Sequence, residues 1–235
     1  MGIKEEIAQK TVAENLLQFM DESGIDMGVL LPIAPYVPYD YVYKIVSYEP
    51  RRLLGFASVV PNPADFAIKE LRRAIEDLGL RGLKLHPGMQ GFCILHPHVI
   101  KVIRFAGELG VPVAIHAVKG DLSILYFKSV KEHGLPVPDR IEDYDLLPVL
   151  VSGTTIAYAH MGGIVEEIGP QRFATYIKHP GAEKLLFGSE HIMGLTPDWL
   201  SARKQIMFIK NLPELTGEEK ELILSKNAKK MLGIK

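Results

Sequence analysis

Three apolar runs in this chain end in a histidine or an acid, and this pattern constrains the fold more than any other feature. The runs are VPVAIHA (111–117), IAYAHMGG (156–163) and KLLFGSEH (184–191). A buried strand carries a polar side chain to the edge of a sheet in this way, and glycine serves where the backbone then turns sharply. The pattern predicts a sheet with its chemistry at the carboxyl ends of the strands.

Strands and helices alternate along the whole chain. The apolar runs predict six strands, at residues 26–33, 53–60, 81–86, 111–117, 156–163 and 184–191. Helical spacing predicts helices at 4–23, 40–48, 64–78, 98–109, 123–133, 143–150, 164–179, 197–209 and 217–231. Gly24, Gly79 and Gly110 stand where three of these helices should end.

This alternation predicts an α/β fold built from parallel βα units, most simply a (β/α)8 TIM-barrel-like domain. The length of 235 residues fits one domain spanning residues 1–235. An open, doubly wound sheet is the competing topology. No glycine-rich phosphate-binding turn follows the first predicted strand, which disfavours it.

Composition excludes several function classes. A net charge of -1 offers no basic excess to neutralise phosphates, so nucleic acid is not an expected partner. No apolar run is long enough to cross a membrane, and no signal-peptide core is present at the N-terminus. Cys93 is the single cysteine, so no intrachain disulfide can form. We expect a cytoplasmic protein that acts on a small-molecule substrate.

His116, His160 and Glu190 stand at three predicted strand ends and form a candidate metal site. Neutral imidazole and carboxylate groups suit zinc, manganese or iron, and the metal would activate a bound water. The three side chains converge only if their strands share one barrel mouth. Otherwise each histidine is a hydrogen-bonded residue of a polar rim. His191 adjoins Glu190 but faces the opposite way on a strand, and we favour Glu190 as the ligand.

Lys84 and His86 alternate with Leu83 and Leu85 on the third predicted strand. If Leu85 packs against helices, Lys84 and His86 point into the barrel. Lys84 could then hold a substrate carboxylate, or serve as a carbamylated metal ligand. It could equally pack its stem and extend its head into solvent.

The remaining candidates favour structural roles. His96 and His98 stand near a helix start, where they are expected to cap that helix. Cys93 has no histidine partner by motif, and Ser189 lacks the G-x-S-x-G elbow of a hydrolase serine.

Taken in order, seven segments resemble the metal-dependent amidohydrolase superfamily, in the branch of the aminocarboxymuconate-semialdehyde decarboxylase-like enzymes. They are TVAENLLQFMDESGIDMGVLLP, LLGFASVVP, GLRGLKLHPGMQGF, GVPVAIHA, IAYAHMGG, KLLFGSEH and ILSKNAKKMLGI. The resemblance implies a distorted (β/α)8 barrel with one divalent metal, usually zinc. It also implies hydrolysis or non-oxidative decarboxylation of small carboxylated or aromatic compounds. His116 and His160 match the metal-site histidines of the fifth and sixth strands, and Glu190 stands where the family has an aspartate.

The chain departs from the family pattern in three places. No H-x-H strand precedes the first helix, the seventh strand is not evident between His160 and Lys184, and a glutamate replaces the last-strand aspartate. The barrel is therefore expected to be distorted or incomplete, and the missing ligands weaken the expected activity. An open sheet edge of this kind is usually covered by another chain, which predicts a homodimer.

Together these observations predict a metal-dependent hydrolase or a decarboxylase (a lyase) acting on a small carboxylated or cyclic substrate. The divalent metal is expected to be zinc, although a metal-free protein remains open. Two alternative interpretations stay open. The protein could be a non-catalytic binding or structural relative, or the natural chain could start upstream of residue 1. The assignments are Glu190 and His160 as catalytic residues; Lys84, His86 and His191 as substrate-binding residues; and His116, His160 and Glu190 as metal ligands.

Overall fold

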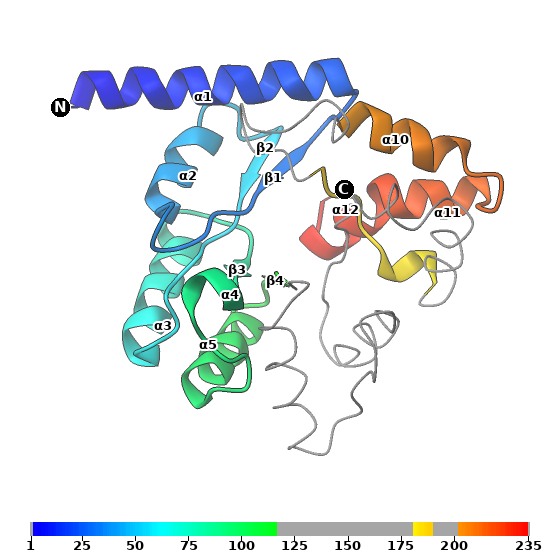
Figure 1. Cartoon of the computed structure of the whole chain (residues 1–235). Helices are drawn as coiled ribbons and strands as arrows, with labels where there is room; N and C mark the ends of the chain where they lie inside the picture. Colours follow the sequence, from blue (N-terminus) through cyan, green and yellow to red (C-terminus); the bar gives the residue numbers. More distant parts are fainter. Residues whose placement is uncertain (1, 117–180, 190–201, 235) are drawn as a thin grey trace. The chain divides into compact units, whose positions relative to one another are not determined.

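A computed structural model of the chain describes residues 2–116, 181–189 and 202–234 (Figure 1). The chain divides into two compact units, the first comprising Met1–Asp21 with Ile25–Leu146 and the second Glu22–Gly24 with Leu147–Lys235. The predicted elements at 123–133, 143–150, 156–163 and 164–179 lie outside the described residues. No helix among the described residues is long and apolar enough to span a membrane.

The first unit alternates helices and short strands, as predicted. In order they are α1 (Gly2–Ser23), β1 (Gly28–Leu30), α2 (Tyr39–Val46), β2 (Leu53–Gly55), α3 (Ala64–Arg72) with its π-helical continuation η1 (Arg73–Asp77), β3 (Leu83–Leu85), α4 (Pro87–Gln90), α5 (Pro97–Glu108) and β4 (Val113–Ile115). The four predicted helices end within two residues of the observed ones. The predicted strands were too long, because the apolar runs continue beyond the hydrogen-bonded ladders. The short helix α4 was not predicted.

Gly24, Gly79 and Gly110 end their helices as predicted. Their φ angles are +73°, +70° and +69°, values in the left-handed region that favours glycine. A side chain at these positions would strain the turn that leads each helix into the following strand.

The described strands are parallel and follow the chain order in space. Gly28 of β1 lies opposite Leu53 of β2, and Leu83 of β3 lies opposite Val113 of β4. A single parallel bridge between Ala57 and Leu83 links the two strand pairs. The order β1-β2-β3-β4 is the order of a barrel. In a doubly wound sheet, later strands are instead placed on both sides of the first strand. These strands therefore favour the barrel over the competing topology.

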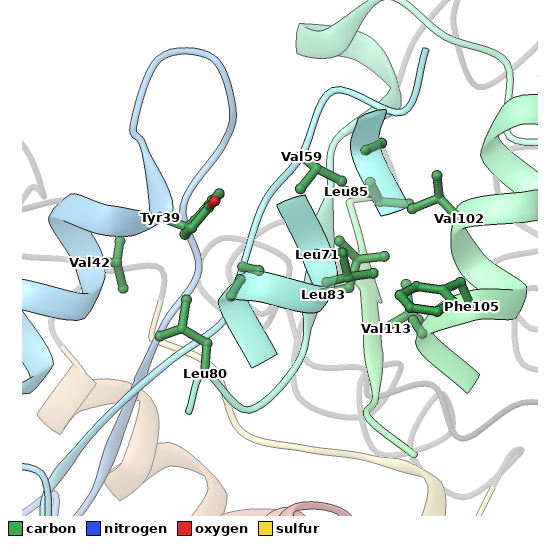
Figure 2. Packing of buried hydrophobic residues seen from close by; sticks show 14 of the residues in the cluster. Tyr39, Val42, Val59, Leu71, Leu80, Leu83, Leu85, Val102, Phe105 and Val113 are labelled. Atoms are coloured by element: carbon green, nitrogen blue, oxygen red, sulfur yellow. The ribbon is translucent and has the colours of Figure 1, made fainter. Parts of the chain in front are cut away.

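One face of this sheet, which we call the outer face, packs against α3 and α5. Leu83 and Leu85 are fully buried there, in one apolar cluster with Leu71 of α3 and Val102 of α5 (Figure 2). Burying each such leucine contributes roughly 1.5–3 kcal/mol. Because successive side chains of a strand alternate, the residues between these leucines belong to the opposite, inner face.

The inner face is filled at its amino end by an aromatic ring. Phe56 is buried there beside Gly82, and a Cβ placed on Gly82 would lie 2.5 Å from the Phe56 ring. Glycine is therefore required at residue 82 by close approach of the ring.

In the second unit, the prediction of a strand at 184–191 is wrong for the residues that the structure describes. Residues Ala182–Lys184 form the short 3-10 helix η3, Leu185 makes only a single bridge, and 186–189 are irregular. The side-chain amide of Asn227 donates to the carbonyls of Ala182 and Leu185, at 2.7 Å each, and the Phe187 N–H donates to the Ile223 carbonyl at 2.9 Å. These contacts join the segment to the C-terminal helices of the same unit.

The helices of the second unit agree better with prediction. They are α10 (Ala202–Asn211), α11 (Gly217–Glu221), η5 (Leu222–Lys226) and α12 (Asn227–Leu232). The last three occupy the span predicted as one helix at 217–231. A capping box starts them: Thr216 accepts from the Glu219 N–H, and the Glu219 carboxylate accepts from the Thr216 N–H.

Candidate active site

Lys84 and His86 lie on the inner face of β3, as the alternation with Leu83 and Leu85 predicted. Both side chains are buried, each with 8% of its surface exposed. Lys84 pairs with Ala114 in the parallel ladder, and the His116 N–H donates to the Leu85 carbonyl at 2.9 Å. Extending this register places His86 directly opposite His116, so that both imidazoles lie on the inner face at the carboxyl ends of their strands.

The two imidazole rings are stacked. Their centroids are 4.0 Å apart and their planes differ by 15°. This spacing follows from the register, since neighbouring strands lie about 4.8 Å apart. Burial lowers the pKa of His86, and the positive charge of Lys84 lowers it further. The ring is consequently neutral at neutral pH, the form in which an imidazole can accept a hydrogen bond or ligate a metal.

Lys84 is a buried basic residue. Among the described residues, no hydrogen bond or ion pair holds its ammonium group. Burial lowers the pKa of Lys84 from 10.5 to about 8. A lysine that merely extends its head into solvent would be exposed, so that interpretation does not fit. A buried cation of this kind gains most from an anionic ligand.

The helix α4 holds His86 from one side. The Met89 N–H donates to Nδ1 of His86 at 3.1 Å, and the His86 N–H donates to Oε1 of Gln90 at 2.8 Å. The Gln90 amide in turn donates to the Val59 carbonyl at 2.9 Å. The sequence analysis did not predict the role of Gln90. The one local sign of the helix α4 that carries it is Pro87 at the first helical position, which is typical of a helix start.

His96 and His98 cap helices and take no part in this site. Nδ1 of His96 accepts from the His98 N–H at 3.3 Å at the start of α5, as predicted. Nδ1 of His98 accepts from the Ala64 N–H at 2.9 Å, so it caps α3 rather than its own helix. The predicted capping role is confirmed for both histidines, but His98 caps α3 and not α5 as predicted.

His160, Glu190 and His191 lie outside the described residues, so their convergence with His116 stays a prediction. Within residues 2–116, 181–189 and 202–234, no three His, Cys, Asp or Glu side chains gather closely enough to hold a metal ion. His116 has the chemistry of a metal ligand, because a half-buried imidazole suits zinc or manganese. The described inner face thus offers two imidazoles, His86 and His116, beside a buried lysine.

Solved structures with a similar fold include two decarboxylases. The fold is similar to that of 2,6-dihydroxybenzoate decarboxylase from Rhizobium, with a TM-score of 0.65, 16% identity, and coverage of 93% of this chain and 87% of that one. It is also similar to 5-carboxyvanillate decarboxylase from Novosphingobium aromaticivorans, with a TM-score of 0.66, 14% identity, and coverage of 100% and 86%. That structure contains manganese and a nitrobenzoic acid. At these identities the likeness shows the fold alone: an α/β protein of the TIM-barrel type.

Sequence comparison defines the family. The Amidohydrolase family model matches residues 9–169, more than half of the chain. A curated relative, 2-amino-3-carboxymuconate-6-semialdehyde decarboxylase from Dictyostelium discoideum, is 31% identical over 86 residues, which are 37% of this chain and 24% of that protein. The match spans about a quarter of the relative's length. The chain belongs to the amidohydrolase family, as its motifs indicated.

Proposed function

We propose that the chain is a metal-dependent hydrolase or non-oxidative decarboxylase acting on a small carboxylated or cyclic substrate. One observation carries the proposal: a buried Lys84, with no charge partner among the described residues, lies beside two stacked imidazoles at the carboxyl ends of parallel strands. In barrel enzymes this end of the sheet is where chemistry is done. A carboxylate on the substrate supplies the charge that Lys84 lacks.

Each residue has a proposed role. Lys84 binds the substrate carboxylate, and His86 and His191 orient the substrate. His116, His160 and Glu190 hold a divalent metal, with zinc proposed first, although a neighbour of similar fold contains manganese. A bound metal ion supplies positive charge that polarises a substrate oxygen. His160 and Glu190 move the proton that the reaction requires.

The barrel is proposed to be one domain over residues 1–235, incomplete at its first and seventh strands. The outer edge of β1 supports an associated proposal, a homodimer. Among the described residues, no strand pairs with that edge. Val29 and Leu31 are also exposed there, to 37% and 45%. Unpaired apolar edges of this kind recruit another chain. The lone Cys93 supports a reducing, cytoplasmic location.

The decisive experiment measures the metal content of the purified protein by elemental analysis, beside the variants His116→Ala and His160→Ala. We expect stoichiometric metal in the wild type and its loss in both variants. A second arm measures binding of 3-methoxy-4-hydroxy-5-nitrobenzoic acid, the ligand in the neighbouring decarboxylase structure. Metal-free protein whose stability is unchanged in both variants contradicts the enzyme and supports a non-catalytic binding relative.

A further inference from the structure

The helix α4 contacts every polar group of His86 except one. The His86 N–H donates to Oε1 of Gln90 at 2.8 Å, the His86 carbonyl accepts from the Gln90 N–H at 2.9 Å, and Nδ1 accepts from the Met89 N–H at 3.1 Å. Among the described residues, no hydrogen bond involves the remaining polar atom, Nε2. The ring is also fixed by stacking on His116.

The bond from Met89 determines where the His86 proton resides. A backbone N–H can only donate, so Nδ1 must present its lone pair to Met89. A neutral imidazole has a single N–H, which must then be at Nε2. A nitrogen that bears a proton donates hydrogen bonds and cannot ligate a metal. The geometry therefore makes His86 a donor.

Gln90 connects His86 to the segment that follows the neighbouring strand β2. The Lys84 N–H donates to the Ala57 carbonyl at 2.7 Å, so a regular parallel ladder would next join the His86 N–H to the Val59 carbonyl. Instead the Gln90 carboxamide lies between them, accepting from His86 and donating to Val59 at 2.9 Å. The strand ends are joined through a side chain, and His86 is held at both its backbone and its ring.

We propose that α4, with Gln90 as a positioning residue, holds His86 as the Nε2–H tautomer. His86 therefore donates a hydrogen bond to an anionic oxygen of the substrate beside Lys84, and is not a metal ligand. The identity of the acceptor as a substrate oxygen rests on the proposed function. The tautomer does not, because it follows from the contacts of residues 84–90.

The tautomer is measurable in the full-length wild-type protein. Proton–nitrogen correlation spectra of protein with isotope-labelled histidine distinguish protonated from unprotonated ring nitrogens, and the His86 signals are those lost in His86→Gln. We expect a protonated Nε2 and an unprotonated Nδ1 at neutral pH, unchanged when zinc is added. His98 is an internal standard, since its Nδ1 also accepts a backbone N–H. A major Nδ1–H form, or loss of the Nε2 proton on adding zinc, overturns the proposal.

Matched variants test the two contacts. Met89→Pro removes the N–H that faces Nδ1, whereas Met89→Ala keeps it, and proline is tolerated in a first helical turn. We expect a mixture of tautomers in Met89→Pro and the wild-type spectrum in Met89→Ala.

The Gln90 variants test the contact with the His86 backbone. Gln90→Glu keeps an acceptor for the His86 N–H, while Gln90→Met keeps only the shape. A tautomer shift in Gln90→Met but not in Gln90→Glu supports positioning. A fall in stability with no spectral shift in any of these variants shows a merely structural role. The wild-type spectrum decides the tautomer even where a variant does not fold.

Binding of 3-methoxy-4-hydroxy-5-nitrobenzoic acid tests the donor role separately. Glutamine can place an N–H near the position of Nε2, so His86→Gln should recover part of the binding that His86→Leu loses. His86→Leu should bind roughly 10- to 100-fold more weakly, the usual effect of losing a hydrogen bond to a charged group. Equal binding by His86→Leu contradicts the donor role. If the wild type binds none of this acid, the proposed function fails, while the tautomer measurement stands alone.

Discussion

Two stacked histidine pairs lie among the described residues, and they differ in origin, spacing and exposure. His86 and His116 come from neighbouring strands, with centroids 4.0 Å apart and planes at 15°. His96 and His98 lie two residues apart at the start of α5, with centroids 5.2 Å apart and planes at 28°. The first pair is created by strand register and lies on the inner face. The second is created by a helix cap, and His96 is exposed. Ring stacking alone therefore says little about function.

The lysines beside the two pairs show what burial changes. Lys84 accompanies His86 and has no carboxylate partner among the described residues, so burial lowers its pKa to about 8. Lys101 contacts Asp65 at 2.7 Å in a solvent-exposed pair, and it lowers the pKa of Asp65, with a smaller contribution from His98. Solvent screens the charge of Lys101, whereas the buried charge of Lys84 gains from an anionic ligand.

The largest expected effect comes from removing the buried charge. Lys84→Met should raise the free energy of unfolding at pH 7 by up to about 3 kcal/mol, the cost of lowering a pKa from 10.5 to about 8. Because the folded-state pKa is the lower one, the unfolded chain holds more protons between about pH 8 and 10.5. Wild-type stability should rise over that range and the difference from Lys84→Met should vanish. Urea unfolding at pH 7 and at pH 10 measures this.

The matched control is Lys101→Met, which removes an exposed charge of the same kind. It should change stability little at either pH, and added salt should reduce even that change. A Lys84→Met protein no more stable than the wild type at pH 7 would show that an anionic partner already neutralises Lys84.

The second effect separates the histidine pairs by metal affinity. His116→Ala should weaken zinc binding by at least roughly 10- to 100-fold. That is the usual loss when a residue that only holds a metal ligand in place is removed, and loss of a ligand itself should cost no less. His96→Ala should leave it unchanged, because that ring caps a helix. Competition with a chromophoric chelator measures both constants. Equal affinities for the two variants would remove the functional distinction between the pairs.

The smallest effect tests the capping role of the pair His96 and His98. His98→Ala should lower the free energy of unfolding by about 1 kcal/mol, because it leaves the Ala64 N–H without its acceptor. His98→Asn keeps an acceptor at the position of Nδ1 and should recover most of the loss. Thermal unfolding measures both, and the idea is wrong if the alanine variant is as stable as the wild type.

Local patterns in the sequence predicted the features that depend on local structure. Helix limits followed from apolar spacing and from glycines such as Gly79, and the inner-face position of Lys84 and His86 followed from alternation with leucines. The resemblance carried by the ordered motifs predicted the family. Strand lengths were overestimated because an apolar run shows burial but not where the ladder bonds stop.

Features set by distant partners could not be predicted. The segment 184–191 has a strand-like composition, yet in its described part the Leu185 carbonyl bonds to Asn227 and the Phe187 N–H to Ile223, each more than 30 residues away. The approach of His86 to His116 depends on strand register, which a single sequence does not specify where both faces are buried. The Gln90 contact with Val59 joins positions 31 residues apart. The convergence of His160 and Glu190 with His116 stays a prediction.

The Phe56 ring has a consequence for the strand that carries Lys84. It lies against Gly82, two residues before Lys84 on the same face of the strand, and leaves no room there for a Cβ. Any side chain at residue 82 would have to displace a buried ring from the segment that follows β2, so the position of Lys84 depends on a residue that carries no chemistry itself.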